Sequence, residues 1–356
     1  MGIDRLLKLR QEMERQKLDA LLVSQNENRR YISRFTGSAG MVIVTRVNAY
    51  LAVDFRYTVQ AEKEASGFEI VHIKRDIADW LPEFIADLGL RSVGFEAHVL
   101  SYRLARQLSE KLRNNHKTTK LVPSSNIVES IRSIKEPEEL DLIAKASKLA
   151  DSSIKYLQSI LNSGITEKDV ALQLEKWLRE HGSEAMPFDI IVASGPNSAL
   201  PHAQPSDRAI VPDEPIVVDF GAKVNGYCCD ITRTFCLGTG DETFARIYDI
   251  VLSAQLTGMS LIKSEMKANQ ADQLSREVID QAGYQQNFGH GLGHGLGLAV
   301  HELPSLSPNS GDLLLSDGMV FTIEPGVYIP GWGGIRIEDT VTLQGGKVVS
   351  LTNAKK

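Results

Sequence analysis

Cysteine, aromatic residues and long apolar runs are all scarce in this chain. Its 356 residues include three cysteines, and aromatic side chains make up 6%. Cys228, Cys229 and Cys236 are odd in number and lack a C-x-x-C spacing, so we expect neither a disulfide framework nor a thiolate zinc site. We interpret the three as packing residues.

Signals for export, membrane insertion and nucleic-acid binding are also lacking. The first 16 residues are charged and amphipathic, without the apolar core of a signal peptide. No stretch approaches the roughly 18 apolar residues of a membrane span. The formal net charge is -6, and lysine and arginine form no basic stripe. We therefore expect a cytoplasmic protein that binds neither membranes nor nucleic acids.

The order of apolar patterns predicts two domains. Helical and strand-like segments alternate up to about Val122, which is typical of an α/β domain. Pro123–Asn126 is rich in turn residues, so we expect domains over 1–125 and 126–356. We expect helices over 3–15, 78–87 and 102–113, and strands over 20–23, 41–45, 50–53 and 92–95.

Two similar blocks of helices and strands follow in the second domain. Glu136–Glu139 combines a proline with acids, as at a helix start, and this helix can run to about Leu161. Thr166 and Asp169 have the spacing of a helix cap. Two more helices are expected over 244–263 and 269–282, with strands after each pair. The pattern predicts an α+β domain in which helices cover a mostly antiparallel sheet.

One predicted hairpin, Ile216–Phe235, carries two aspartates. Asn225-Gly226 is a strong two-residue turn signal, and this turn places Asp219 opposite Thr232. Asp219 and Asp230 then share a face, with Cβ atoms about 7 Å apart or less. Two such carboxylates repel each other unless a cation lies between them, and a metal pair fits that gap. The alternative is that they are turn or edge residues.

A glycine-rich segment from Gly289 to Glu302 holds three histidines. Its alternating glycines exclude a stable helix, so His290 and His294 are not the helical pair of an HExxH protease. The spacing also fails the GxGxxG pattern of a dinucleotide loop. A single histidine here is more often structural, but three, with His301, favour a site.

Two acids follow the histidines. Glu324 is placed at a strand end beside Pro325-Gly326, and Glu338 shares a strand face with Arg336. Arg336 with a buried glutamate is as often a structural ion pair as part of a site. Four carboxylates and one imidazole form an oxygen-rich set that suits Mn²⁺ or similar ions. One carboxylate is expected to bridge two metals.

Together these residues resemble the pita-bread metallopeptidases, the family that includes methionine aminopeptidase, aminopeptidase P and prolidase. The shared pattern is D-F-G-x(8)-D at Asp219 and Asp230, G-H-G-x-G at His294, E-P-G at Glu324 and R-I-E-D at Glu338. The resemblance implies an α+β fold with a C-terminal pita-bread (creatinase/aminopeptidase-like) catalytic domain. It implies that these five residues hold two divalent ions, most often Mn²⁺, with Co²⁺ or Zn²⁺ as alternatives.

The resemblance also implies roles for residues around the metals. His202 matches a histidine that contacts substrate near the scissile bond, and His301 one that stabilises the tetrahedral state. Arg336 matches an arginine of the proline-specific members, Glu324 is the candidate proton carrier, and His290 falls on another family position near the substrate.

Two N-terminal motifs narrow the expected activity. Tyr31–Ser38 and Asp54–Tyr57 resemble the α/β creatinase-type N-terminal domain of aminopeptidase P and prolidase, which supports dimerisation. We therefore expect a homodimeric exopeptidase that acts on peptides with proline in second position. The Asp54–Tyr57 motif favours an Xaa-Pro aminopeptidase, and an Xaa-Pro dipeptidase is the alternative.

Two other functions of the same fold are alternatives. Creatinase hydrolyses a small guanidino compound without metal, and some chaperone-like relatives are peptide- or histone-binding modules. Both kinds lose metal ligands, whereas all five are present here. Bound-metal content discriminates between these alternatives and a peptidase.

Overall fold

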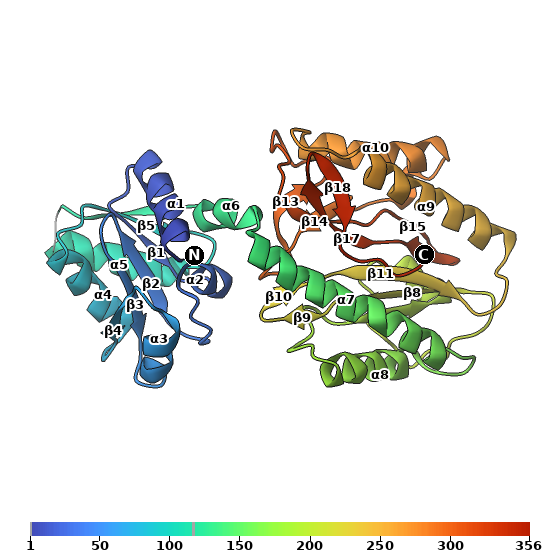
Figure 1. Cartoon of the computed structure of the whole chain (residues 1–356), viewed down its shortest axis with the longest axis horizontal. Coiled ribbons are helices and arrows are strands. Elements are labelled where there is room, and N and C mark those ends of the chain that lie inside the picture. Colours follow the sequence, from blue (N-terminus) through green and yellow to red (C-terminus); the bar gives the residue numbers. More distant parts are fainter. Residues whose placement is uncertain (1, 116–117) are drawn as a thin grey trace. The chain divides into compact units, whose positions relative to one another are not determined.

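The chain forms two compact units. The computed structural model describes residues 2–115 and 118–356, and contacts divide the chain into residues 1–132 and 133–356 (Figure 1). Helix α6 (Ile127–Ser133) ends at this division, shortly after the predicted boundary at residues 125 and 126. Among the described residues, no helix is both long and apolar enough to cross a membrane.

The first unit is a mixed six-stranded sheet covered by helices. Its strand order is β4-β3-β2-β1-β5-β6, with β1 antiparallel to β2 and parallel to β5. The strands are β1 (Ala20–Val23), β2 (Met41–Thr45), β3 (Ala49–Val53), β4 (Glu69–His72), β5 (Ser92–Glu96) and β6 (Lys120–Ser124). The helices are α1 (Gly2–Arg15), α2 (Asn26–Ser33), α3 (Thr58–Glu64), α4 (Ile77–Asp87) and α5 (Tyr102–Asn115).

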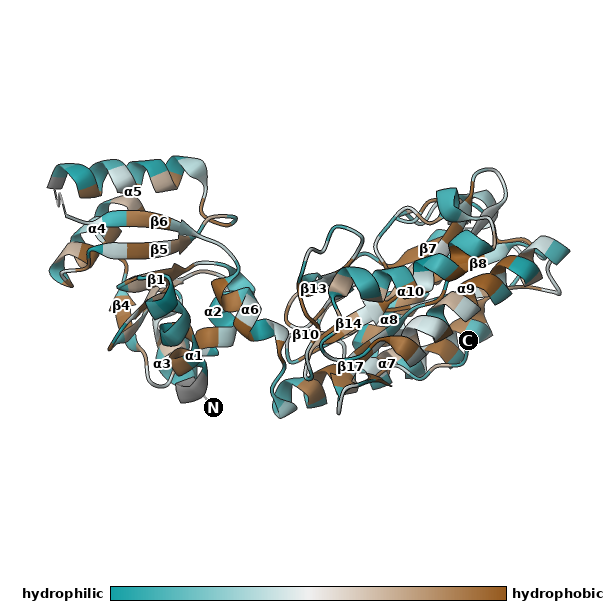
Figure 2. Cartoon of the chain, turned by 90° about the horizontal axis from the view of Figure 1, so that it is seen from above, coloured by the Kyte–Doolittle hydropathy of each residue, from teal (hydrophilic) through white to brown (hydrophobic). Residues whose placement is uncertain are grey.

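The inner strands β1, β2 and β3 are buried at every position, whereas the edge strands β4 and β6 are partly exposed. Leu22 and Ile43 of adjacent strands pack with Leu81 of α4 and Leu108 of α5. In Figure 2 the covering helices show both hydrophilic and hydrophobic residues, as amphipathic helices do. The predicted helices and strands of this unit are present, whereas the short helices α2, α3 and α6 were not predicted.

The segment predicted as a domain linker is partly regular structure. Pro123 and Ser124 complete β6, where Pro123 pairs with Phe95 of β5. Strand β6 is an edge strand, and an edge tolerates a proline that has no N–H to donate. The turn composition of this segment therefore reflects a sheet edge as well as a connection.

The second unit contains antiparallel sheets and two helix pairs. Its helices are α7 (Pro137–Ile160), α8 (Glu167–Glu180), α9 (Glu242–Leu261) and α10 (Ala268–Gln281), with short 3₁₀ turns η1 (Gly195–Ala199) and η2 (Gln285–Asn287). Its strands are β7 (Ile191–Ser194), β8 (Pro215–Phe220), β9 (Lys223–Val224), β10 (Tyr227–Cys228), β11 (Ile231–Cys236), β12 (Gly293–Gly295), β13 (Glu302–Leu306), β14 (Val320–Ile323), β15 (Gly326–Ile329), β16 (Gly333–Arg336), β17 (Asp339–Gln344) and β18 (Lys347–Ser350). All the strand pairs are antiparallel, as predicted.

Each helix pair covers its own sheet and buries its own core. Strands β11-β8-β7 pack on α7 and α8, where Leu157 and Leu174 meet Val218. Strands β13-β12-β14-β17-β18 pack on α9 and α10, with Phe321 at the centre of the core. The two cores hold the two sheets in place, and Asp219 of β8 and His294 of β12 belong to these sheets.

Local signals explain where the first helix pair begins. Pro137 occupies the first turn of α7, and the Glu136 N–H donates to the Glu139 carboxylate at 2.9 Å. Thr166 caps α8 by accepting a hydrogen bond from the Asp169 N–H at 3.1 Å. Both predicted helix starts are therefore confirmed.

Candidate metal centre

The hairpin from β8 to β11 positions the two aspartates as predicted. Asn225 and Gly226 both have positive φ, 46° and 79°, as the two-residue turn requires. The turn sets the register, and Asp219 of β8 faces Thr232 of β11. Asp219 and Asp230 both line one cavity of about 400 Å³.

The predicted histidine ligand lies on β12, a strand flanked by glycines. A Cβ at Gly293 would overlap the Thr322 carbonyl of β14, and one at Gly295 would overlap the Leu303 carbonyl. These glycines therefore let β12 fit between its neighbouring strands with His294 pointing into the cavity. His294 Nε2 lies 3.6 Å from Asp230 Oδ2 and 3.4 Å from Glu324 Oε1.

The two glutamates enter from strand ends. Glu324 follows the last residue of β14 and accepts a hydrogen bond from the Thr322 hydroxyl at 3.0 Å. Glu338 lies between β16 and β17, so the single strand predicted here is broken at this residue. The Thr232 hydroxyl donates to Glu338 Oε2 at 2.6 Å. Each glutamate is thus oriented by a neighbouring threonine.

Burial of several acids at one place perturbs their protonation. Burial and the nearby Glu338 and Asp219 carboxylates raise the pKa of Asp230 well above its ordinary range. Burial, with repulsion from Glu324, also raises the pKa of Glu338 strongly. Burial raises the pKa of Glu324 to about 7, although Arg336 opposes the shift. Without a bound cation, these carboxyl groups therefore keep their protons up to a higher pH than ordinary carboxyl groups do.

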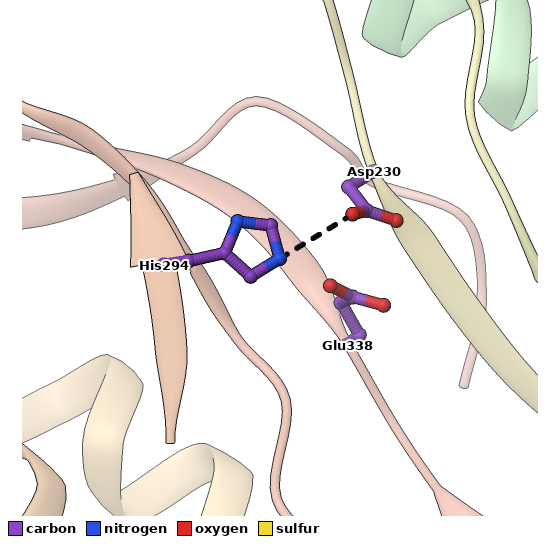
Figure 3. A group of neighbouring side chains, drawn as sticks. All are labelled: Asp230, His294 and Glu338. Carbon is purple, nitrogen blue, oxygen red and sulfur yellow. Dashed lines mark ion pairs between the residues drawn. The ribbon is translucent and has the colours of Figure 1, made fainter. Parts of the chain in front are cut away.

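The donor set fits bound cations. Asp230, His294 and Glu338 each offer a ligand atom within 4.8 Å of the other two, and Figure 3 shows the three side chains converging. The buried oxygens Asp219 Oδ1 and Asp230 Oδ1 have no hydrogen-bond partner among the described residues. A bound cation would satisfy carboxylate oxygens of this kind, and an oxygen-rich set with one imidazole suits hard divalent ions.

Arg336 links the ligand cluster to a second layer of polar residues. Its Nη2 lies 2.6 Å from Asp219 Oδ2, and its Nη1 donates to the Tyr328 hydroxyl at 2.9 Å. The Tyr328 hydroxyl is also 3.0 Å from His290 Nε2. Of the two roles considered for Arg336, the ion pair is present, but it is made with Asp219 on a neighbouring element rather than with Glu338 on its own segment.

The remaining predicted histidines line the same cavity as the ligand set. The His301 ring lies edge-on to His294, with ring centroids 4.2 Å apart. Burial lowers the pKa of both His290 and His301 to about 4. All nine residues predicted for the site line this one cavity: Asp219, Asp230, His294, Glu324, Glu338, His202, His290, His301 and Arg336.

Sequence reasoning missed three residues that hold the predicted ones. Tyr328 joins His290 to Arg336, while Thr232 and Thr322 each donate to a glutamate. The hairpin register already placed Thr232 opposite Asp219, which was a usable signal. Tyr328 gave no such signal, because a tyrosine within an apolar strand is usually a core residue.

Comparison with known proteins identifies the family. Residues 141–344 match the model of metallopeptidase family M24, and residues 5–134 match the creatinase/prolidase N-terminal domain. The chain is 36% identical to the Xaa-Pro dipeptidase of Pyrococcus horikoshii over 98% of this chain and 97% of that protein.

Solved structures of relatives are similar to this chain over nearly its whole length. An Xaa-Pro dipeptidase from Bacillus anthracis is 38% identical with a TM-score of 0.96, covering 100% of this chain and 99% of that one. The X-Pro aminopeptidase from Thermotoga maritima is 35% identical with a TM-score of 0.87, covering 96% of this chain and 97% of that one. The chain therefore belongs to metallopeptidase family M24, with a pita-bread catalytic domain that follows a creatinase/prolidase-type N-terminal domain.

Proposed function

We propose that this peptidase hydrolyses the bond between the first residue of a peptide and a proline in second position. The observation that carries the proposal is the convergence of four carboxylates and His294 in one cavity that His202 and His301 also line. The relatives named as Xaa-Pro dipeptidases and X-Pro aminopeptidase support the proline specificity.

We assign the divalent ions to Asp219, Asp230, His294, Glu324 and Glu338, and Mn²⁺ is the ion proposed, with Co²⁺ or Zn²⁺ as alternatives. The orphaned oxygens of Asp219 and Asp230 and the raised pKa values of Asp230 and Glu338 support this assignment. When bound, the ions supply the Lewis acidity that makes water nucleophilic near neutral pH and polarises the scissile carbonyl.

Two side chains of the cavity are proposed to handle protons and charge. Glu324 Oε1 takes the proton of the attacking water and passes it to the leaving proline nitrogen. His301 is neutral at pH 7, because its pKa is about 4, and it carries one N–H to donate to the developing oxyanion. Arg336 holds Asp219 in place through their 2.6 Å ion pair.

Recognition of proline is proposed to depend on shape. The proline nitrogen of an Xaa-Pro bond carries no N–H, so no hydrogen-bond acceptor can select it. His202 and His290 line the cavity and are proposed to contact the ring and the adjoining carbonyl. Ring shape and these contacts then distinguish proline from other residues.

Two substrate lengths are candidates, and a different observation supports each. Among the described residues that line the cavity, Arg336 is the one arginine or lysine, and it is already bonded to Asp219 and Tyr328. With no cation left for a dipeptide's carboxylate, the cavity supports an Xaa-Pro aminopeptidase that accepts longer peptides. The names of the Pyrococcus and Bacillus relatives support the alternative, an Xaa-Pro dipeptidase.

The test compares hydrolysis of Ala-Pro and Ala-Pro-Ala by chain that has been chelated and reloaded with Mn²⁺. Comparable or faster cleavage of the tripeptide supports the aminopeptidase, and cleavage of the dipeptide alone supports the dipeptidase. Chelated protein without added metal is the control. If the reloaded protein cleaves neither peptide, the proposed function is wrong.

Two further properties remain proposals. We propose a homodimer, which size-exclusion chromatography with light scattering tests directly. We also propose a cytoplasmic location, which the three free cysteines, Cys228, Cys229 and Cys236, support. Fractionation of the source cells tests this second proposal.

A further inference from the structure

A buried ion pair lies behind the segment that carries His301. This residue ends the connection from β12 to β13, and Glu302 is the first residue of β13. Neighbouring side chains of an extended chain point to opposite sides. His301 accordingly lines the cavity, while the Glu302 side chain turns inward and is 3% exposed.

Glu302 meets a lysine from a distant part of the chain. Lys135 Nζ donates to Glu302 Oε1 at 2.6 Å, and the Lys135 side chain is 1% exposed. Lys135 Nζ also donates to the Ser133 carbonyl at 3.3 Å. The Ala299 N–H, three residues before Glu302, donates to the other carboxylate oxygen at 3.5 Å. Both oxygens of Glu302 are thus engaged.

The connection between the two histidines is shaped around this pair. A Cβ at Gly297 would overlap the Glu302 carboxylate and press on Lys135, so the glycine lets the chain pass close to the pair as it stands. The Cys228 N–H donates to the Gly297 carbonyl at 2.7 Å, two residues before Asp230. The Lys135–Glu302 pair and the hairpin that carries Asp230 therefore hold the connection between His294 and His301 from two sides.

A charged pair is a costly way to fill this interior. Two buried charges lose their hydration, and apolar residues of similar size often stabilise such a position equally well. The pair instead fixes a position. Its short N–H···O bond holds Glu302 at one place, and His301 is the neighbouring residue in the chain. A catalytic group needs this fixed placement, since small displacements of a positioned group cost large factors in rate.

We propose that the Lys135–Glu302 pair is a positioning device for His301, which holds its imidazole at the correct distance from the reacting carbonyl. The inference rests on the proposed function, in which His301 stabilises the oxyanion. Neither Lys135 nor Glu302 is among the described residues that line the cavity, so we expect both to act through the segment that carries His301.

The test neutralises both partners together, so that no single buried charge remains. We would compare Lys135→Met/Glu302→Gln with the unmodified chain, each reloaded with Mn²⁺, and measure kcat and KM on Ala-Pro-Ala and Ala-Pro, bound metal and the unfolding midpoint. The matched control is Lys267→Met/Asp312→Asn, which removes an exposed ion pair of the same unit, with side chains 45% and 86% exposed. Lys135→Arg, which keeps the charge, serves as the conservative rescue.

The pair variant is expected to lose about 10- to 100-fold in kcat, with KM and bound metal within twofold. Lys135→Arg should recover most of this loss, and the exposed-pair control should show none. In a His301→Ala background, the pair substitutions should cost nothing further, because their effect passes through His301.

Three results would overturn the inference. An equal loss of kcat in the unmodified and His301→Ala backgrounds would show that the pair acts elsewhere. A lower unfolding midpoint with unchanged kcat would make the pair purely structural. If His301→Ala alone left kcat unchanged, the role of His301 in the proposed function would fail and this inference with it, whereas either of the first two results would overturn the inference and leave the proposed function standing.

Discussion

Removal of the metal should make folding depend on pH in an unusual direction. In the metal-free protein, burial holds the pKa of Glu324 at about 7 instead of its ordinary 4.5. Between these two values the folded state binds a proton that the unfolded state has lost, so stability falls as pH rises. The contribution of the Glu324 proton to the stability of the metal-free protein is complete below about pH 4.5 and is lost as pH rises through 7.

The interval sets the size of the effect. Each pH unit between the two pKa values corresponds to about 1.4 kcal/mol, so Glu324 alone makes the metal-free protein about 3 kcal/mol less stable at pH 8 than at pH 4.5. The raised pKa values of Asp230 and Glu338 act in the same direction. Urea unfolding of chelated protein across this range, with Mn²⁺-loaded protein as the control, measures the change.

The same carboxyl groups should release protons when metal binds. At pH 6, a group with a pKa near 7 is about nine-tenths protonated, and coordination requires its carboxylate form. Calorimetric titration with Mn²⁺ at pH 6, in two buffers of different ionisation enthalpy, should therefore detect about one proton or more per chain. The share from Glu324 should nearly vanish at pH 8. Metal binding without proton release at pH 6 would show that the acids are already ionised and would refute the reasoning from burial.

Four further substitutions test the centre. Asp230→Ala or Glu338→Ala should lose bound metal and nearly all activity while circular dichroism stays unchanged, because the cores do not include these residues; full turnover by metal-analysed protein would contradict the ligand assignment. Thr232→Val should weaken Mn²⁺ binding about 10- to 100-fold in equilibrium dialysis, since its hydroxyl orients Glu338, and unchanged affinity would make that hydrogen bond irrelevant. Gly293→Ala should lower the unfolding midpoint and deplete metal, because its Cβ would overlap the facing strand; a normal midpoint would show that β12 has room to move.

Much of the site could be predicted from short segments of sequence. The Asn225-Gly226 turn sets the hairpin register, and the pairing of Asp219 with Thr232 follows from it. The glycines around His294 exclude a helix and predict a bare segment from which a histidine can approach a ligand closely. The resemblance in residue spacing then assigned all nine site residues, which the structure brings into one cavity. Such features are local, because backbone conformation and side-chain alternation depend on neighbouring residues.

Other features depend on contacts across the chain and could not be read from any segment. Arg336 reaches Asp219 across 117 positions, and Lys135 reaches Glu302 across 167. From the sequence alone, Glu338 is an equally good ion-pair partner for Arg336. A lysine before a helix, such as Lys135, is usually a surface charge. The sequence by itself therefore determined which residues gather in the candidate centre and the hairpin register that brings Asp219 and Asp230 together. Only the packing of the two sheets on their helix pairs decided which charged side chains are buried together. Packing brings together residues that are far apart in the sequence, and the residues next to them in the chain do not indicate these contacts.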